Sequence, residues 1–141
     1  MQLDIVTPEK TLYSGEVNEI VANTADGEVG ILPHHINLIT KLIPGELIIK
    51  ANKKQEFIGI TDGFLQVNDN HVTVLADYAV HARDIDVEQA IAAQKRAEKI
   101  LKEKREGISE QDFAVAQADL RRAIMELKVA RRGHHPAGLP Q

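Results

Sequence analysis

The first 84 residues alternate short apolar runs with residues that favour turns. The runs are rich in Ile, Val and Leu and occupy residues 3–6, 17–22, 36–42, 47–50, 57–60, 64–67 and 72–76. Turn-forming residues separate them, namely Ser14-Gly15, Asp26-Gly27, Pro44-Gly45, Asp62-Gly63 and the segment 68–70. Asp-Gly and Asn-rich pairs supply the positive φ angles that tight hairpins require. The pattern predicts an N-terminal antiparallel β-sandwich or flattened barrel, in which we expect about ten short strands.

The pattern changes abruptly after Asp84. No Gly occurs until Gly107, and Ala, Gln, Glu, Lys and Arg, which are strong helix formers, predominate. Asp84 or Asp86 can cap a helix that runs to about Arg105, and Gly107 can end it. The sequence therefore predicts a first helix directly after the sandwich.

A second helix is expected to follow and to pack against the first. Ser109 and Asp112 have the spacing of a capping box at its start. Apolar residues, many of them alanine, then repeat at spacings of three and four in both helices, which predicts an antiparallel two-helix hairpin. They are Phe113, Ala116, Leu120, Ala123, Leu127 and Ala130 in the second helix and Ala90, Ala93, Ala97 and Ile100 in the first. Each buried methyl contributes only about 0.8 kcal/mol, so two interpretations stay open, a hairpin that can undock and a fixed structural hairpin.

These patterns divide the chain into a sandwich at residues 1–84, a hairpin at residues 85–132 and a flexible tail at residues 133–141. Residues 1–84 carry 6 Lys and Arg against 12 Asp and Glu, a net charge of −6, whereas the remainder carries 11 against 9, a net charge of +2. Phosphate binding needs a concentrated basic face, so the acidic sandwich argues against nucleic acid as a partner.

Histidine is the natural place to look for chemistry, because the chain has 6 His and no Cys. His34 and His35 would point to opposite sides of an extended segment, and His134-His135 lie in the tail, so we expect neither a catalytic nor a metal site. Phosphate-loop, dinucleotide and hydrolase motifs are missing, which leaves a small sandwich enzyme without support. No apolar run approaches the roughly 20 residues that cross a bilayer, so we expect a protein that is soluble or only peripheral to a membrane.

Cationic residues follow one face of the second predicted helix. Arg121, Met125, Lys128 and Arg132 repeat at spacings of 4, 3 and 4, with Arg122 and Arg131 beside them. The face is either an ordinary solvated surface or an electrostatic docking stripe for an acidic partner.

Four segments taken together resemble the epsilon subunits of bacterial F-type ATP synthases. They read GEVGILPHH at residues 27–35, IPGEL at 43–47, DGFLQVNDNHVTVLAD at 62–77 and IDVEQA at 85–90. The resemblance covers residues 1 to about 132 and implies a non-catalytic rotor subunit in the central stalk of a proton- or sodium-translocating synthase. It also implies that the sandwich binds the gamma subunit and the ring of c subunits. The implied location is the cytoplasmic face of the bacterial plasma membrane, with membrane contact only through the complex.

The resemblance assigns the segment around His34-His35 to contact with the c ring. The implied contact residues are Glu28, Gly30, Pro33, His34 and His35. The family's usual Pro-Gly-His reads Pro33-His34-His35 here, so an imidazole occupies a position that normally has no side chain. If this position needs a positive φ, His34 is costly there, although His tolerates the left-handed region better than β-branched residues do.

In the family the hairpin can fold beside the sandwich or open along gamma into the alpha/beta hexamer, where it blocks ATP hydrolysis. A helix of about 20 residues is roughly 30 Å long, so an opened hairpin reaches much further than a closed one. The resemblance implies that an opened hairpin meets an acidic segment of the catalytic subunit through Arg121, Arg122, Lys128, Arg131 and Arg132.

Some bacterial members also bind ATP between sandwich and hairpin, through an Ile/Leu-Asp-x-x-Arg-Ala motif and arginines of the second helix. Asp86 and Arg122 match that pattern, but Gln89 stands in place of the motif's arginine and Glu126 in place of a second-helix arginine. Losing a phosphate partner and adding a carboxylate both weaken the binding of a triphosphate. We expect that no cofactor is required, and a weak regulatory ATP site at Asp86 and Arg122 stays open as an alternative. In that alternative the chain is an ATP sensor whose hairpin is held closed by the nucleotide.

Overall fold

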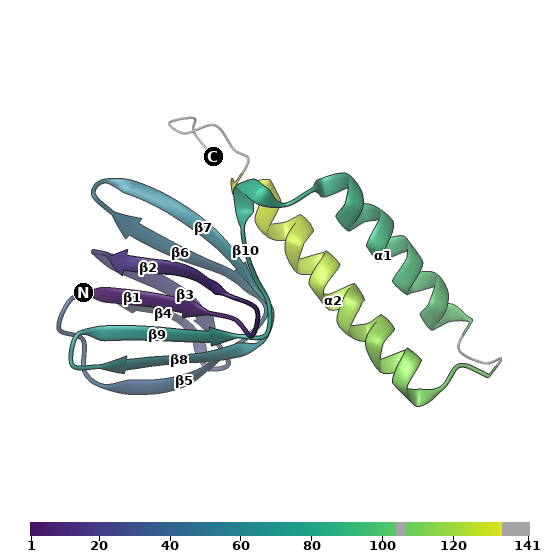
Figure 1. Ribbon diagram of the computed structural model, residues 1–141, viewed down its shortest axis with the longest axis horizontal. Coiled ribbons are helices and arrows are strands. Elements are labelled where there is room, and N and C mark those ends of the chain that lie inside the picture. The colour runs from purple at the N-terminus through teal and green to yellow at the C-terminus, as the bar shows by residue number, and fades with distance from the viewer. Residues whose placement is uncertain (104–106, 134–141) are drawn as a thin grey trace.

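The chain folds into a β-sandwich followed by an antiparallel hairpin of two helices, which confirms the predicted fold class (Figure 1). The structure is a computed structural model that describes residues 1–103 and 107–133, so the predicted tail lies outside the described residues from residue 134 onward. The strands of this part of the chain are β1 (Gln2–Val6), β2 (Thr11–Glu16), β3 (Glu19–Thr24), β4 (Gly27–Ile31), β5 (Leu38–Leu42), β6 (Gly45–Ala51), β7 (Lys54–Ile60), β8 (Gly63–Asn68), β9 (His71–Ala76) and β10 (Ala79–His81). A short 3₁₀ turn, η1 (Ala82–Asp84), leads into α1 (Val87–Lys102) and α2 (Glu110–Gly133).

The strands form one sheet that folds back on itself. Neighbouring strands follow the order β10-β7-β6-β3-β5-β8-β9-β1-β2, and β4 pairs with β3. The pairs are antiparallel, apart from β1 and β9, which run parallel to each other. β10 lies at one edge of this order and next to the helices, so the sheet ends where the hairpin begins (Figure 1).

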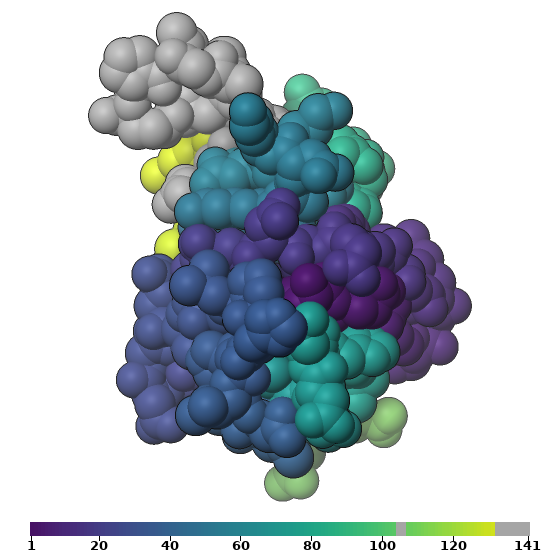
Figure 2. Space-filling model, turned by 90° about the vertical axis from the view of Figure 1, so that its left-hand side faces the viewer, coloured from purple at the N-terminus to yellow at the C-terminus, as the bar shows by residue number. Residues whose placement is uncertain are grey.

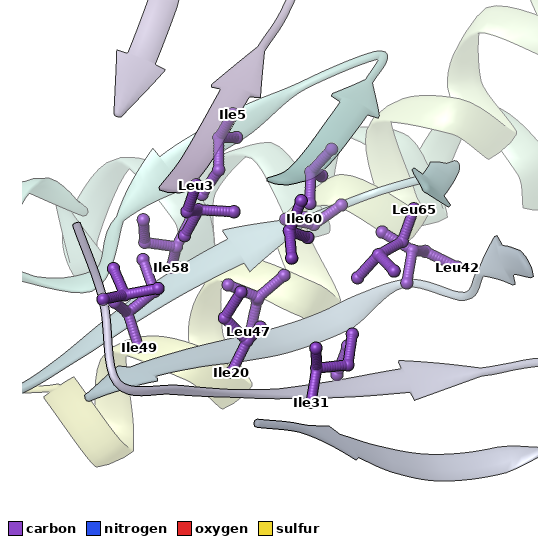
Figure 3. Close-up of a cluster of buried hydrophobic side chains, with 14 of the residues drawn as sticks. Leu3, Ile5, Ile20, Ile31, Leu42, Leu47, Ile49, Ile58, Ile60 and Leu65 are labelled. Atoms are coloured by element: carbon purple, nitrogen blue, oxygen red, sulfur yellow. The ribbon is translucent and has the colours of Figure 1, made fainter. Parts of the chain in front are cut away.

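Alternate residues of the strands point into a single aliphatic core. Leu3 and Ile5 of β1 and Leu65 of β8 have no exposed surface. Figure 3 shows the Leu and Ile side chains of β1, β3, β6, β7 and β8 pointing toward one another in the interior. Burying one such side chain contributes about 1.5–3 kcal/mol, so this core dominates the stability of the sandwich.

Three strands lie outside the predicted apolar runs. β2 is mostly polar, and β10 is only 3 residues long. β4 lies in the segment 27–35, which contains the predicted c-ring contacts, and it pairs along its length with β3, from Ile31 opposite Ile20 to Gly27 opposite Thr24. Backbone pairing with a neighbour, which does not depend on an apolar run, accounts for these strands.

One of the predicted turns is wrong, and another lies at the expected place, between β7 and β8, but without a positive φ angle. Ser14-Gly15 lies inside β2, where both residues pair with β1. Gly63 is the first residue of β8 and has no positive φ angle. It lies opposite Ala76 in the neighbouring strand, so a side chain is absent here because of space and not because of backbone conformation.

Two hairpins turn where the sequence predicts them, and a third turns at residues that the sequence analysis did not select. Gly27 has a φ of 117° at the β3–β4 hairpin, and Asp69 and Asn70 have φ angles of 49° and 65° at the β8–β9 hairpin. The β6–β7 hairpin turns at Asn52 and Lys53, with φ angles of 51° and 65°. The sequence analysis did not predict this last turn, in which a single asparagine is followed by lysine.

Side-chain caps begin both helices at the expected residues. Asp86 Oδ1 accepts a hydrogen bond from the backbone N–H three residues later, at 3.1 Å. Ser109 Oγ accepts the equivalent bond from Asp112 N–H, also at 3.1 Å. α1 ends at Lys102, earlier than the predicted end near Arg105, and residues 104–106 lie outside the described residues.

The contact between the helices matches most of the predicted stripe. Phe113, Leu120 and Leu127 are half-buried, whereas Ile100 is 40% exposed and departs from the prediction. The fully buried members of the stripe are Ala90, Ala97, Ala116, Ala123 and Ala130. The two helices therefore approach each other mainly through alanine.

α2 lies between α1 and the sandwich and has a second buried face (Figure 1). Met125 and Val129 are 3% and 1% exposed on that face. This corrects the prediction that Met125 lies on the cationic face. The residues that join α2 to the end of the sandwich form a cluster separate from the sandwich core, which we call the docking cluster: Ala82, Ile85, Met125, Val129 and Ala130.

Candidate functional site

The segment between β4 and β5 is braced against the tip of the β8–β9 hairpin. We call residues 32–37 the distal loop, because this tip lies at the end of the sandwich away from the helices, the end that Figure 2 faces. The backbone N–H of His34 donates to Asn70 Oδ1 at 2.7 Å, and Asn37 Oδ1 accepts from the backbone N–H of Asp69 at 3.0 Å. His34 has a φ of 67°, the left-handed conformation that we considered for this position. The two hydrogen bonds fix the shape of the loop.

Large apolar side chains are exposed on and beside the distal loop. Leu32 is 57% exposed, Ile36 is 78% exposed, and Ile39 of β5 is 71% exposed. A group of exposed apolar side chains on a folded surface is typical of an interaction site. Sequence reasoning did not select these three residues, because an apolar run alone does not tell which of its members face outward.

The five residues predicted to contact a c ring occupy β4 and the distal loop. Glu28 and Gly30 are exposed on β4, and Pro33 and His34 are exposed at the start of the loop. His35 is half-buried, and its Nδ1 lies 2.8 Å from the backbone oxygen of the next residue. The structure therefore places four of the five on the surface and turns the fifth partly inward.

A cleft of about 690 Å³ lies between the hairpin and the end of the sandwich. Asp86 and Arg122, the residues predicted for a weak ATP site, both line it, so the structure brings them to one place. Arg96 of α1 also lines the cleft and was not identified from the sequence. An excess of carboxylates opposes the binding of a polyanion. The charged lining residues are Asp84, Asp86, Asp119 and Glu126 against Arg96 and Arg122.

Tyr78, in the connection between β9 and β10, contacts two residues of α2. Its hydroxyl donates to Glu126 Oε2 at 3.1 Å, and Arg122 Cζ lies 3.6 Å from the centre of its ring. Arg122 Nε is 3.5 Å from Glu126 Oε1. Burial, followed by the negative charge of Glu126, raises the pKa of Tyr78, whereas Arg122 acts in the opposite direction. Tyr78 therefore stays protonated at neutral pH and can donate its hydrogen bond.

The predicted cationic stripe on α2 is divided. Arg121, Lys128 and Arg131 are exposed. Arg122 is also exposed, over 49% of its side chain, but it lines the cleft and contacts Tyr78 as well. The side chain of Arg132 lies outside the described residues. Within the described part of the chain, no helix combines the length and the apolar character needed to cross a membrane.

A serine, a histidine and an aspartate meet on the outer face of β1, β2 and β9. Ser14 Oγ donates to Asp4 Oδ1 at 2.6 Å, and His71 Nε2 lies 2.6 Å from Asp4 Oδ2. Both groups contact the carboxylate, so the imidazole is not placed beside the hydroxyl as a catalytic base would be. The group joins three strands instead. Across residues 1–103 and 107–133, no group of three or more acidic or histidine side chains could hold a metal ion.

Replacing Asp4 with asparagine should lower the melting temperature by about 2–4 °C at neutral pH, the equivalent of about 1 kcal/mol for a chain of this size. Hydrogen bonds, first from Ser14 and then from His71, hold the pKa of Asp4 below its usual value of 3.8. A carboxylate with a lowered pKa contributes stability above its ordinary pKa, and the contribution is lost as the pH falls through the lowered value.

Calorimetry of the wild type and Asp4→Asn across a range of pH checks this prediction. The difference in melting temperature should be largest near neutral pH and should shrink below pH 3.8. Glu9→Gln, at an exposed position in the following turn, is the matched control and should change little at any pH. A difference for Asp4→Asn that does not depend on pH would contradict the assignment.

Both parts of the chain match families of known proteins. Residues 1–82 match the family model described as ATP synthase, Delta/Epsilon chain, beta-sandwich domain, and residues 83–131 match ATP synthase, Delta/Epsilon chain, long alpha-helix domain. A relative from Nitrosococcus oceani, named ATP synthase epsilon chain, is 47% identical over 94% of this chain and 93% of its own length. A relative of the same name from Dehalococcoides mccartyi is 43% identical over 96% of both chains.

Solved structures show the same arrangement. A chain in the Euglena gracilis mitochondrial ATP synthase assembly of OSCP, F1 and c-ring is similar with a TM-score of 0.66 and 25% identity, over 84% of this chain and 74% of that one. A chain in the Tetrahymena thermophila mitochondrial ATP synthase central stalk and c-ring shares the fold, with a TM-score of 0.59 and 15% identity over 92% and 96% of the two chains.

Proposed function

Because the chain belongs to the delta/epsilon chain family of ATP synthase, in which it is a non-catalytic stalk subunit, we propose that it couples the catalytic head to the c ring as part of the rotating central stalk. The observation that carries this proposal is the division into a sandwich with its own core and a hairpin docked through a separate cluster. A rigid sandwich can transmit rotation driven by protons or sodium ions. A hairpin that is held only through the separate docking cluster can undock from the sandwich without disturbing the sandwich core. In a bacterium the chain would be held at the cytoplasmic face of the plasma membrane through the complex.

We assign the c ring to the distal loop and the adjoining strand β4. The exposed side chains of Leu32 and Ile36 supply apolar area beside the polar contact residues. The hydrogen bonds to the β8–β9 tip hold the loop in shape before binding, so little conformational entropy is lost when it binds. The assigned contact residues are Glu28, Gly30, Pro33, His34 and His35.

We assign the gamma subunit to the outer face of β8 and β9. Phe64 and Leu75 lie directly opposite each other on these strands, and each is 54% exposed. A groove of about 390 Å³ beside them is lined by Val6, Pro8 and Ala76 among others. An exposed apolar cross-strand pair next to an apolar groove suits a partner with an apolar ridge.

We assign the hairpin an inhibitory role toward ATP hydrolysis. Exposed cations on α2 would meet an acidic segment of the alpha/beta hexamer once the hairpin opens. The assigned residues are Arg121, Arg122, Lys128, Arg131 and Arg132.

Removing the hairpin by truncation after Asp84 tests the proposed function. Because the sandwich has its own core, the truncated chain should fold and still bind gamma. ATP hydrolysis by the assembled synthase should rise severalfold, since nothing then enters the catalytic hexamer. Unchanged hydrolysis would contradict the inhibitory role. Loss of gamma binding by a folded sandwich would contradict the proposed coupling role.

A second role as an ATP sensor is favoured by one observation, that Asp86 and Arg122 line the same cleft. ATP would hold the hairpin closed if it bound that state better than the open one. Calorimetric titration of the isolated chain with millimolar ATP tests this role, and the absence of both heat and a shift in melting temperature would eliminate it.

A further inference from the structure

Two polar contacts between the sandwich and α2 meet at a single side chain, Tyr78. Its hydroxyl donates to Glu126, and its ring lies under the guanidinium of Arg122. Arg122 and Glu126 are four residues apart, so they occupy one face of α2 and reach Tyr78 together. The hairpin is thus joined to the sandwich by a cation, a carboxylate and a phenol in mutual contact.

Glu126 holds the other two members of this group in place. One of its oxygens accepts the Tyr78 hydroxyl, and the other lies 3.5 Å from Arg122 Nε. The Glu126 side chain is only 15% exposed, so its charge is poorly hydrated and depends on these two partners. Removing one member of such a group weakens the contacts of the remaining two.

We propose that Tyr78, Arg122 and Glu126 form a latch that keeps the hairpin closed against the sandwich without a bound ligand. The inference rests on the proposed function, because a latch matters only in a chain whose hairpin opens. Among the side chains that the structure describes, those of α2 in the docking cluster are Met125, Val129 and Ala130. With so small an apolar contact, the polar group has a large share in setting the ratio of open to closed hairpin.

The latch uses the groups that an anionic ligand in the cleft would need. Arg122 already contacts Glu126 and Tyr78, and Glu126 adds to the negative charge of Asp86 and Asp119 along the cleft. A polyphosphate would have to displace a carboxylate from Arg122 and then lie among the remaining carboxylates. The closed state is therefore set by the chain itself, which argues against the sensor role.

Opening the latch changes what Arg122 can bind. In the closed chain Arg122 contacts Tyr78 and Glu126 while 49% of its side chain stays exposed, and Arg121 and Lys128 are exposed on the same helix. Once α2 leaves the sandwich, Arg122 loses Tyr78 and becomes available to an acidic partner surface. One arginine thus favours the closed hairpin before opening and partner binding after it.

Distance measurements on the full-length chain test the latch. The chain has no Cys, so single cysteines introduced at the exposed positions Lys54 and Val115 can carry a fluorophore pair. Energy transfer, in the free chain and in the assembled synthase, then reports the ratio of open to closed hairpin. Tyr78→Phe, which keeps the ring, and Glu126→Gln, which keeps the shape, should each raise this ratio about tenfold.

Tyr78→Phe removes the hydrogen bond, whereas Glu126→Gln keeps an acceptor oxygen but removes the charge that strengthens this bond and attracts Arg122. The double variant Tyr78→Phe/Glu126→Gln should therefore open the hairpin by less than the product of the two single effects, because both changes act on the same contact. Glu110→Gln removes an acid from the same helix outside the latch and should leave the ratio unchanged. Millimolar ATP should leave the wild-type ratio unchanged as well.

Two results would overturn the latch. The first is an unchanged ratio of open to closed hairpin in both single variants, provided that their melting curves show an intact sandwich. The second is a tenfold or larger fall in this ratio when ATP is added to the wild type. Opened variants in which ATP hydrolysis by the synthase does not fall would support the latch and count against the inhibitory part of the proposed function. The two ideas therefore fail through different measurements.

Discussion

Replacing Gly63 with alanine is expected to lower the free energy of unfolding of the chain by about 3 kcal/mol. A Cβ atom at this position would lie 3.0 Å from Ala76 Cα and closer still to the carbonyl oxygen of Leu75. Both atoms belong to the backbone of β9, which is paired on both sides by β8 and β1 and cannot retreat. Denaturation of the purified variant in urea measures the loss.

Gly30 provides the matched control for this substitution. It also lies in a strand, has no positive φ angle, and would place a Cβ atom in open space. Gly30→Ala should therefore change the free energy of unfolding by less than about 0.5 kcal/mol. Similar losses in the two variants would show that the close approach of β8 and β9 is not what Gly63 provides.

Placing aspartate at both Leu32 and Ile36 is expected to weaken association with the c ring by about 100-fold. Burying an apolar side chain of this size at an interface contributes about 1.5–3 kcal/mol, and a carboxylate in its place must be desolvated. A loss of about 1.4 kcal/mol at each residue is already tenfold. ATP-driven ion pumping by the assembled synthase in vesicles, together with c-ring binding, measures the effect.

Val115→Asp controls for the general effect of a new charge. Val115 is 54% exposed on α2, close to the 57% of Leu32, but it lies far from the distal loop in the fold. This variant should keep both c-ring binding and pumping. If the double variant folds normally and still binds the ring as the wild type does, the distal loop is not the contact surface.

The fold class could be predicted from the sequence because each half has a regular pattern of apolar residues, short runs between turns in the first and spacings of three and four in the second. The apolar runs that became β1, β3 and β5 to β9 supplied the core, and the spacing of alanines such as Ala116 and Ala123 supplied the helix seam. β4 could not be predicted in the same way, because GEVGI becomes a strand only through its pairing with β3. Met125 was misplaced because α2 packs on both sides, and one helical stripe reveals only one of them.

The site residues were harder to predict, since they depend on how separate parts meet. The sequence indicated His34 and its positive φ, but the brace from Asn70 comes from a hairpin 36 residues away. Arg122 was grouped with the other cations of α2 on spacing alone. It is exposed as they are, but it also packs on the ring of Tyr78 and lines the cleft. No pattern along the chain places a tyrosine of the sandwich beside two residues of the second helix.

The central claim is that the hairpin can undock from the sandwich while the sandwich stays folded. Native-state hydrogen exchange of the intact chain tests this claim most directly. We expect amides of α1 and α2 to exchange through an opening of lower free energy than that of β1, β8 and β9 in the core. Tyr78→Phe should lower the value for the helices and leave the value for these strands unchanged. One common free energy for helices and strands, falling together in the variant, would mean a single inseparable unit and would contradict the separation of sandwich and hairpin.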